Sequence, residues 1–246
     1  MPVVSDDVVV ASGVAEPLTY TLDGTTAVVT MDDGKANALS NEMIDGLLAA
    51  LTRAEGEAKA MVLAGRPERF CAGFDLKIMM SGPANATALL TRGSELLLRL
   101  YASKVPLVIA CTGHALAGGA LVLLTGDLRI AAQGAFKIGL NEVSIGLPVP
   151  VLAMELARDR IVKPELDRAT LMATIYNPDE AQLSGYCDAV VAPGEVIATA
   201  KAEAARLGTL ASQAFRATKL RLRGQTIKYI RDTMASDMET LLQPLP

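Results

Sequence analysis

Two glycine-centred segments, about forty residues apart, contain the residues best suited to chemistry. Residues 70–77 read FCAGFDLK and residues 114–120 read HALAGGA. Each follows an expected strand and leads into an expected helix, where small residues let a ligand approach backbone N–H groups that lack intrahelical partners. The N–H groups of Phe74 and Gly118 could hold an oxygen anion, helped by the positive end of the helix beginning at Gly118. One such turn is common in α/β proteins, but the pair indicates acyl-transfer or enolate chemistry.

An oxyanion hole needs a base or nucleophile opposite it, and Glu142 is the best candidate. It follows Gly139 within the apolar residues 136–143, and a carboxylate among apolar neighbours has a raised pKa and is a stronger base. A glutamate at a strand end that points into water fits the same residues equally well. His114, the only histidine, is typical of a structural or exposed residue. No Gly-x-Ser-x-Gly elbow supports a serine hydrolase.

Two groups of basic residues admit two interpretations. They are either solvated helix faces or counter-charges for the phosphates of an anionic ligand. The first group surrounds the first glycine segment, and the second lies near the C-terminus. The groups consist of Arg66, Arg69 and Lys77, and of Lys219, Arg221, Arg223, Lys228 and Arg231. No Walker-type phosphate loop accompanies them.

The hydrophobic pattern predicts the elements that position these residues, with strands and helices alternating through short connections. We expect a hairpin over 18–32, buried strands over 60–64, 106–111 and 128–131, and helices after Ser40, over 87–102 and over 118–125. This order favours an α/β fold with largely parallel pairing. From residue 151 the chain reads as mostly helical. A short strand is expected over 189–191, followed by two helices over 194–243 with Gly208 and Gly224 as candidate breaks.

Composition restricts the classes of function. The 246 residues have a formal net charge of −4 and a pI of about 5.2, which disfavours a nucleic-acid binder. Three widely spaced cysteines fit neither a metal site nor a disulfide framework, so we expect a cytoplasmic protein. Residues 1–7 lack the basic segment of a signal peptide, and no apolar run is long enough to span a membrane. The hydrophobic fraction of 51% predicts an oligomer, because excess apolar surface often lies between subunits.

Four segments, taken in order, resemble the crotonase (enoyl-CoA hydratase/isomerase) superfamily. They are residues 35–39 (KANAL), the two glycine segments, and residues 138–142 (IGLNE). The resemblance covers roughly residues 18–240. It implies a spiral of repeated ββα units over residues 1–190 that binds acyl-CoA. It also implies a helical region over residues 191–246 at the interface of a homotrimer or a dimer of trimers.

Members of this superfamily bind acyl-CoA thioesters and hold the thioester oxygen between two backbone N–H groups, which by position are those of Phe74 and Gly118. Other positions match residues that line the coenzyme A site, the last of them near its phosphates: Lys35, Ala36, Ala38, Ala72, Asp75, Leu76 and Lys77. The acyl pocket is expected to include Met79, Leu121, Asn141 and Leu147. The resemblance implies no metal and no cofactor other than the coenzyme A carried by the substrate.

The chain departs from the hydratases of this superfamily at one position. Those enzymes typically use two glutamates to hold and activate water. Glu142 matches the second, but the first falls on Leu121, which cannot orient water or transfer a proton. A single glutamate resembles the Δ3,Δ2-enoyl-CoA isomerases, in which it would move a proton from C2 to C4 through a thioester enolate.

Two alternatives remain. One is a hydratase in which Asn141 or Ser144 helps to hold water, and the other is a non-catalytic acyl-CoA-binding protein. The sequence leaves the acyl chain length and the geometry of the double bond open.

Overall fold

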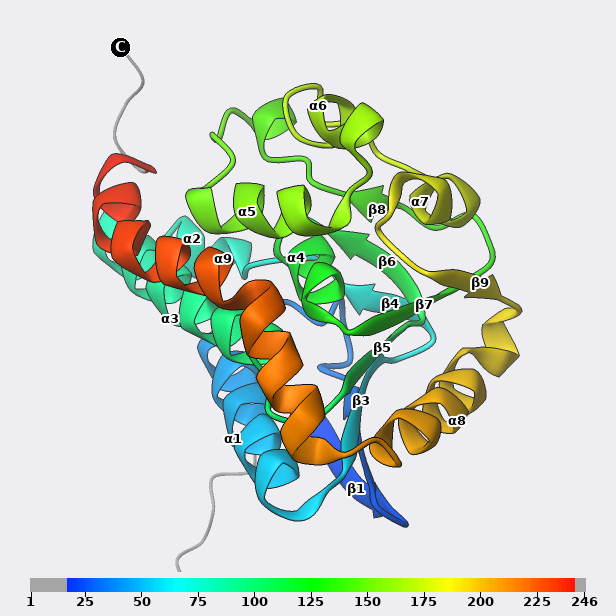
Figure 1. Ribbon diagram of the computed structural model, residues 1–246. Coiled ribbons are helices and arrows are strands. Elements are labelled where there is room, and N and C mark those ends of the chain that lie inside the picture. Colours follow the sequence, from blue (N-terminus) through cyan, green and yellow to red (C-terminus); the bar gives the residue numbers. More distant parts are fainter. Residues whose placement is uncertain (1–16, 242–246) are drawn as a thin grey trace, which may run out of the picture.

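A computed structural model describes residues 17–241. The N-terminal residues examined for a signal peptide therefore lie outside the described residues. A six-stranded sheet forms the centre of the molecule (Figure 1). β1 and β2 pair antiparallel as the expected hairpin, and all later neighbours in this sheet pair parallel. The strands lie in the order β1 (Leu18–Asp23), β2 (Thr26–Met31), β3 (Ala60–Gly65), β5 (Leu107–Cys111), β7 (Leu128–Ala132) and β9 (Ala189–Val191).

A second sheet contains three short parallel strands that the hydrophobic pattern does not reveal: β4 (Glu68–Cys71), β6 (Gly113–Leu116) and β8 (Ile138–Gly139). β4 and β6 each follow a strand of the central sheet after a sharp bend. Glycine is required at both bends. A Cβ atom on Gly65 would lie 2.4 Å from the Arg69 carbonyl oxygen, and one on Gly113 would lie 2.0 Å from the Glu68 carbonyl carbon. The chain thus repeats the strand–strand–helix unit that the resemblance implies.

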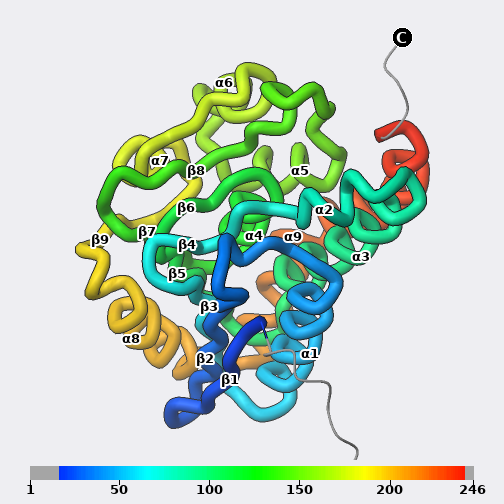
Figure 2. The backbone as a smooth tube through the Cα atoms, turned by 180° about the vertical axis from the view of Figure 1, so that it is seen from behind, coloured from blue at the N-terminus to red at the C-terminus, as the bar shows by residue number. Residues whose placement is uncertain are grey.

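Helices cover both faces of the central sheet, because its parallel strands are apolar on both sides. On one face, α8 (Val196–Gly208) packs Val196, Ala200 and Ala204 against alternate residues of the strands. Figure 2 shows α8 and α1 on opposite sides of the sheet. The helices of the other face are α1 (Asn41–Glu57), α3 (Pro83–Tyr101), α4 (Gly118–Thr125) and α5 (Val151–Arg160).

The starts of two helices illustrate how local sequence sets the element bounds. Ser40 caps α1 as expected, because its hydroxyl accepts a hydrogen bond from the Met43 N–H at 3.2 Å. α3 begins at Pro83, four residues before the expected start at Thr87, since proline suits the first turn of a helix. The remaining short elements are α2 (Leu76–Met79), η1 (Val143–Ile145), η2 (Lys163–Glu165), α6 (Leu166–Ala169), α7 (Pro178–Ser184) and η3 (Pro193–Glu195).

The chain's last described element, α9 (Ser212–Leu241), is a helix of 30 residues that lies along α3 and α5 (Figure 1). Gly208 ends α8 as expected, but the predicted break at Gly224 is wrong because α9 continues through it. A glycine inside a helix costs only about 1 kcal/mol relative to alanine, which tertiary packing readily overcomes. No helix among residues 17–241 is long and apolar enough to cross a membrane. The division of the chain at residue 190 and its assembly stay predictions.

Two basic residues of α9 have neither of the expected roles. Lys219 and Arg223 are buried and pair with Asp127 at 2.7 and 2.9 Å. The Asp127 carboxylate also accepts a hydrogen bond from the Leu107 N–H at 2.8 Å. Burial lowers the pKa of Lys219, and the neighbouring Asp127 opposes that change. Because a buried charge requires a partner, this network fixes α9 against the start of β5. Arg221, Lys228 and Arg231 are exposed.

Candidate functional site

The turn after β4 brings the first glycine segment against the second. Gly73 has a φ of +96°, which favours glycine, and a Cβ atom there would lie 3.2 Å from the Gly118 nitrogen. The next turn is fixed by Asp75, whose carboxylate caps α2 by accepting from the N–H groups of Lys77 at 2.8 Å and Ile78 at 3.3 Å. Phe74, between Gly73 and Asp75, is therefore held beside the start of α4.

The turn between β6 and α4 also depends on close backbone approach. Ala117 has a φ of +49°, and a Cβ atom on Gly119 would lie only 2.0 Å from the Cys71 carbonyl oxygen. Among the hydrogen bonds within residues 17–241, none uses the N–H of Phe74 or Gly118. The two predicted donors are thus free and lie on adjoining turns, and the positive end of α4 adds to the field at this point.

Glu142 is buried, so its interpretation as a strand-end glutamate in water is wrong. Its residue is 8% exposed and lies between β8 and η1, where its carbonyl oxygen accepts from the N–H groups of Ile145 and Leu147, both at 3.0 Å. Its carboxylate atom Oε2 and the neighbouring Asn141 Oδ1 are buried without a hydrogen-bond partner. Burial raises the pKa of Glu142, and a hydrogen bond to its own backbone opposes this only in part. The carboxylate therefore has the character expected of a base.

The first glycine segment and Glu142 meet at an apolar cavity of about 260 Å³. Phe74 and Glu142 line it, as do Met79, Leu121, Asn141 and Leu147, the four residues expected in the acyl pocket. The sequence analysis missed Leu90 of α3 and Leu241 of α9, which come from distant helices. The remaining lining residues are Ala72, Leu76, Leu116, Ala117, Ile145, Pro148 and Pro150. Gly118 is absent from the lining, although the preceding Ala117 belongs to it. An apolar cavity with a few convergent polar groups is the usual form of a ligand site.

The loop over residues 32–40 lies against the first glycine segment through a residue that the sequence analysis missed. Asn37 is fully buried, has a φ of +53°, and donates from its amide to the carbonyl oxygens of Met31, Arg69 and Phe70 at 3.0–3.1 Å. Its neighbour Ala36 accepts from the Ala72 N–H at 3.1 Å.

Two positions expected at the coenzyme A site, Ala72 and Leu76, reach the cavity, whereas the others lie outside its lining: Lys35, Ala36, Ala38, Asp75 and Lys77. Arg66 donates to the Lys35 carbonyl oxygen at 2.9 Å, so it holds this loop. Lys77 is exposed at the start of α2. The structure therefore groups these segments on one side of the site, and their contact with coenzyme A stays a prediction.

His114 has a structural role, as its position suggested. Its Nδ1 atom accepts a hydrogen bond from the Lys137 N–H at 3.0 Å, and its ring packs edge-on against Phe136. Burial lowers its pKa, which favours the neutral form that this hydrogen bond requires. The described residues contain no group of three metal-ligating side chains.

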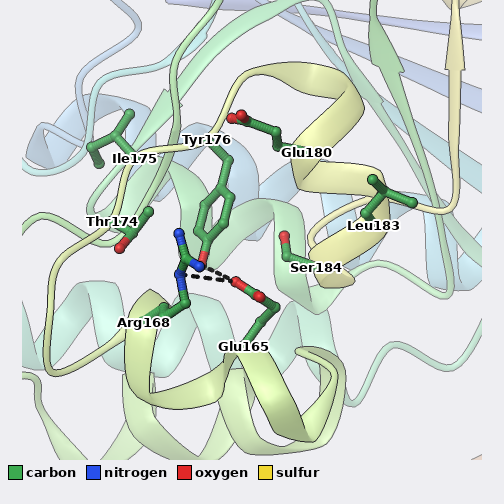
Figure 3. A pocket seen from close by; sticks show the side chains of 8 residues that line it. All are labelled: Glu165, Arg168, Thr174, Ile175, Tyr176, Glu180, Leu183 and Ser184. Atoms are coloured by element: carbon green, nitrogen blue, oxygen red, sulfur yellow. Dashed lines mark hydrogen bonds and ion pairs between the residues drawn. The ribbon is translucent and has the colours of Figure 1, made fainter.

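A second cavity, of about 310 Å³, lies between α6 and α7 (Figure 3). Its Glu165 carboxylate accepts from the Tyr176 hydroxyl at 3.0 Å and pairs with Arg168 at 3.5 Å. Figure 3 shows these three side chains directed toward one another. Because the Glu165 carboxylate is paired whereas Glu142 Oε2 is buried without a partner, the Glu142 cavity is the candidate active site.

Comparison with known proteins agrees with this geometry. The model of the "Enoyl-CoA hydratase/isomerase" family matches residues 21–242. The chain belongs to this family. The human "Enoyl-CoA delta isomerase 1, mitochondrial" is 31% identical over 88% of this chain and 73% of its own length.

Solved structures of the enoyl-CoA hydratase/isomerase family have the same crotonase fold. The human mitochondrial delta3-delta2-enoyl-CoA isomerase has a TM-score of 0.88 at 30% identity, covering 92% of this chain and 90% of that one. An enoyl-CoA hydratase from Mycobacterium ulcerans has a TM-score of 0.85 at 38% identity, covering 92% of this chain and 97% of that one. Relatives with both names thus share the fold, and the family assignment leaves the reaction to be decided by the site.

Proposed function

We propose that this protein is a Δ3,Δ2-enoyl-CoA isomerase that uses Glu142 as its single acid and base. The observation that carries the proposal is the lining of the cavity. Among the described residues that line it, Glu142 is the one ionisable side chain, and the 3%-exposed Leu121 lies where the resemblance places the first glutamate of a hydratase. A bound water needs two or more polar partners, and Leu121 supplies none.

In the proposed reaction, the oxygen of a 3-enoyl-CoA thioester accepts hydrogen bonds from the Phe74 and Gly118 N–H groups. Glu142 takes a proton from C2, and the electron pair of that C–H bond forms the enolate. The protonated Glu142 then returns the proton to C4, while the double bond moves from C3=C4 to C2=C3. The product is the conjugated 2-enoyl-CoA, with no net change in atoms or electrons.

The electrostatics of the site support both halves of this cycle. The raised pKa of Glu142 makes it a stronger base in the first step and keeps it protonated long enough to act as the acid in the second. Loss of one oxyanion donor typically costs about a hundredfold to a thousandfold in rate, so the two free N–H groups supply a large share of the rate enhancement. Coenzyme A enters as part of the substrate, and the proposed reaction needs no resident cofactor. We assign its binding to the segments of Lys35, Ala36 and Ala38 and of Asp75 and Lys77.

A hydratase is the second candidate, and one observation favours it. The Asn141 Oδ1 atom is buried beside Glu142 without a partner, so it could accept a hydrogen bond from a bound water. Ser144 is poorly suited to help, because it is exposed, lies outside the cavity lining and donates its hydroxyl to the Asn141 carbonyl oxygen at 2.7 Å.

A paired assay tests the proposal. The wild type, Glu142→Gln and Asn141→Ala are each given a 3-enoyl-CoA and a 2-enoyl-CoA. An isomerase converts the first substrate and loses that activity in Glu142→Gln. Hydration of the second substrate at a comparable rate, abolished in both variants, would establish the hydratase instead. Binding without turnover of either would indicate a non-catalytic acyl-CoA-binding protein.

A further inference from the structure

Two helices that are far apart in the sequence form part of the cavity wall. Leu90 of α3 and Leu241 of α9 both line it, and each is less than 10% exposed. Together with Met238 of α9 they form an apolar cluster that packs against Phe74 and Met79. Figure 1 places the end of α9 on the side of the molecule away from β8, after which Glu142 follows. An acyl chain whose first carbons lie between Glu142 and the two oxyanion donors would therefore extend toward Leu90 and Leu241.

A hydrogen bond between helices holds this part of the wall in place. The Asp237 carboxylate, one turn before Leu241, accepts from the Val151 N–H at 2.8 Å. Val151 is the first residue of α5 and follows Pro150, which also lines the cavity. A carboxylate at this position satisfies a free N–H group and interacts favourably with the positive end of α5. The end of α9 is thus tied to the start of α5, next to another residue of the cavity wall.

The volume limits what the cavity can hold. An apolar protein cavity of about 150 Å³ binds benzene, which has six carbon atoms. By proportion the cavity of about 260 Å³ has room for about ten carbon atoms, counting those of the reacting thioester. A longer chain would have to displace Leu90 or Leu241, and both are packed into the cluster with Met238.

We propose that Leu241 and Leu90 set the maximum acyl chain length of this protein, at about ten carbons, and that Asp237 is the positioning residue that keeps Leu241 in place. This inference rests on the proposed function in requiring an acyl-CoA in the cavity, but it does not require isomerisation. It assigns short- and medium-chain acyl-CoA thioesters as the ligand class.

Calorimetric titration with saturated acyl-CoA thioesters of 4 to 16 carbons tests the inference without depending on turnover. For the wild type, affinity should rise about fourfold per added methylene, because each buried methylene contributes about 0.8 kcal/mol. Beyond about ten carbons the affinity should fall. Leu241→Ala and Leu90→Ala each remove three carbons, so the decline should begin two or three carbons later. In Leu241→Phe the decline in affinity should begin at a shorter chain length than in the wild type. Because it fills the cavity instead of emptying it, this variant tests the wall even if an alanine variant is unstable.

Met238→Ala is the matched control. Met238 belongs to the same apolar cluster and is 8% exposed, but it does not line the cavity. It should destabilise the protein without moving the limit. For Asp237, the alanine variant should weaken the preference of the wild type for 8 over 14 carbons at least tenfold, and Asp237→Asn, which keeps an acceptor oxygen, should restore it.

The outcomes separate the two proposals. A limit that shifts as described in a protein without isomerase activity supports the wall and overturns the isomerase. An unchanged limit in Leu241→Ala, Leu90→Ala and Leu241→Phe, or an equal shift in Met238→Ala, overturns the wall and leaves the isomerase standing. Failure to bind any acyl-CoA overturns both.

Discussion

Replacing Glu142 with glutamine should abolish activity and at the same time stabilise the fold. Glutamine has nearly the shape of glutamate but cannot accept and return a proton, so the isomerase rate should fall by about two to four orders of magnitude. In the wild type the residue Glu142 is 8% exposed, and its carboxylate is buried with one unpaired oxygen. Removing that charge removes the cost of burying it.

The sign of the stability change follows from the direction of the pKa shift. Burial raises the pKa of Glu142 in the folded state above its ordinary value of 4.5. Between these two pKa values the folded state binds more protons than the unfolded state, so the free energy of unfolding falls as the pH rises. Each tenfold difference in proton affinity between the folded and unfolded states costs about 1.4 kcal/mol of stability at neutral pH. We therefore expect the melting temperature of Glu142→Gln to exceed that of the wild type at pH 7, by about 2–4 °C per kcal/mol.

Differential scanning calorimetry between pH 4 and pH 8 measures this difference. The advantage of Glu142→Gln should vanish below pH 4.5 and grow toward neutral pH. Over the same range the kcat/KM of the wild type should decline as the pH falls through the raised pKa of Glu142. Glu95→Gln, at an exposed position on α3, is the matched control and should change neither quantity. This account of the buried base would be refuted if the stability of Glu142→Gln minus that of the wild type were smaller at pH 7 than at pH 4.5.

Three further substitutions test the elements that hold the site. Asp127→Ala leaves two buried cations unpaired and should lower the free energy of unfolding by about 3–5 kcal/mol, which corresponds to roughly 6–20 °C by calorimetry. Asp232→Ala is the control, because it removes an exposed ion pair on α9 and should cost under about 1 kcal/mol. Gly93→Ala places a Cβ atom 2.1 Å from the Phe74 ring and should reduce kcat more than tenfold by displacing the oxyanion donor; Gly224→Ala, with open space around it, should keep full activity. Tyr186→Phe removes a buried hydroxyl that lies near the Leu140 backbone without a hydrogen bond of standard geometry. Urea unfolding should therefore show little change in stability, and a loss above about 1 kcal/mol would contradict this assignment.

Local patterns in the sequence predicted most of the strands and helices that local interactions determine. The apolar runs identified all six central strands and the hairpin between the first two, because a parallel strand buried on both faces leaves a continuous apolar signature. The three strands of the second sheet are too short to leave one. β8 has two residues, and β4 begins with the exposed Glu68 and Arg69. Their places are set by the glycine bends and by pairing between distant segments.

The candidate site likewise contains residues that the sequence could predict and residues that it could not. The glycine spacing identified the two turns that carry the free N–H groups of Phe74 and Gly118, since each N–H group is fixed by its own turn, and their role as oxyanion donors stays a prediction. The wall residues Leu90 and Leu241 could not be predicted, because they are leucines among many and lie more than a hundred positions apart in the chain. Lys219 and Arg223 were misread for the opposite reason. Their charge pattern is typical of an exposed helix, and only the position of Asp127 in the fold shows that they are buried.

Leu121 connects the basicity of the site with its choice of reaction. Its side chain is part of the apolar lining that keeps water from Glu142, and such desolvation is the largest cause of the raised pKa. A glutamate in its place could hold a water and would bring a second negative charge to the cavity. One residue of α4 therefore favours proton transfer and disfavours water addition at once. The apolar wall that we propose to accept the hydrocarbon chain also raises the pKa of the single carboxylate, and this is how one glutamate would suffice for the proposed isomerisation.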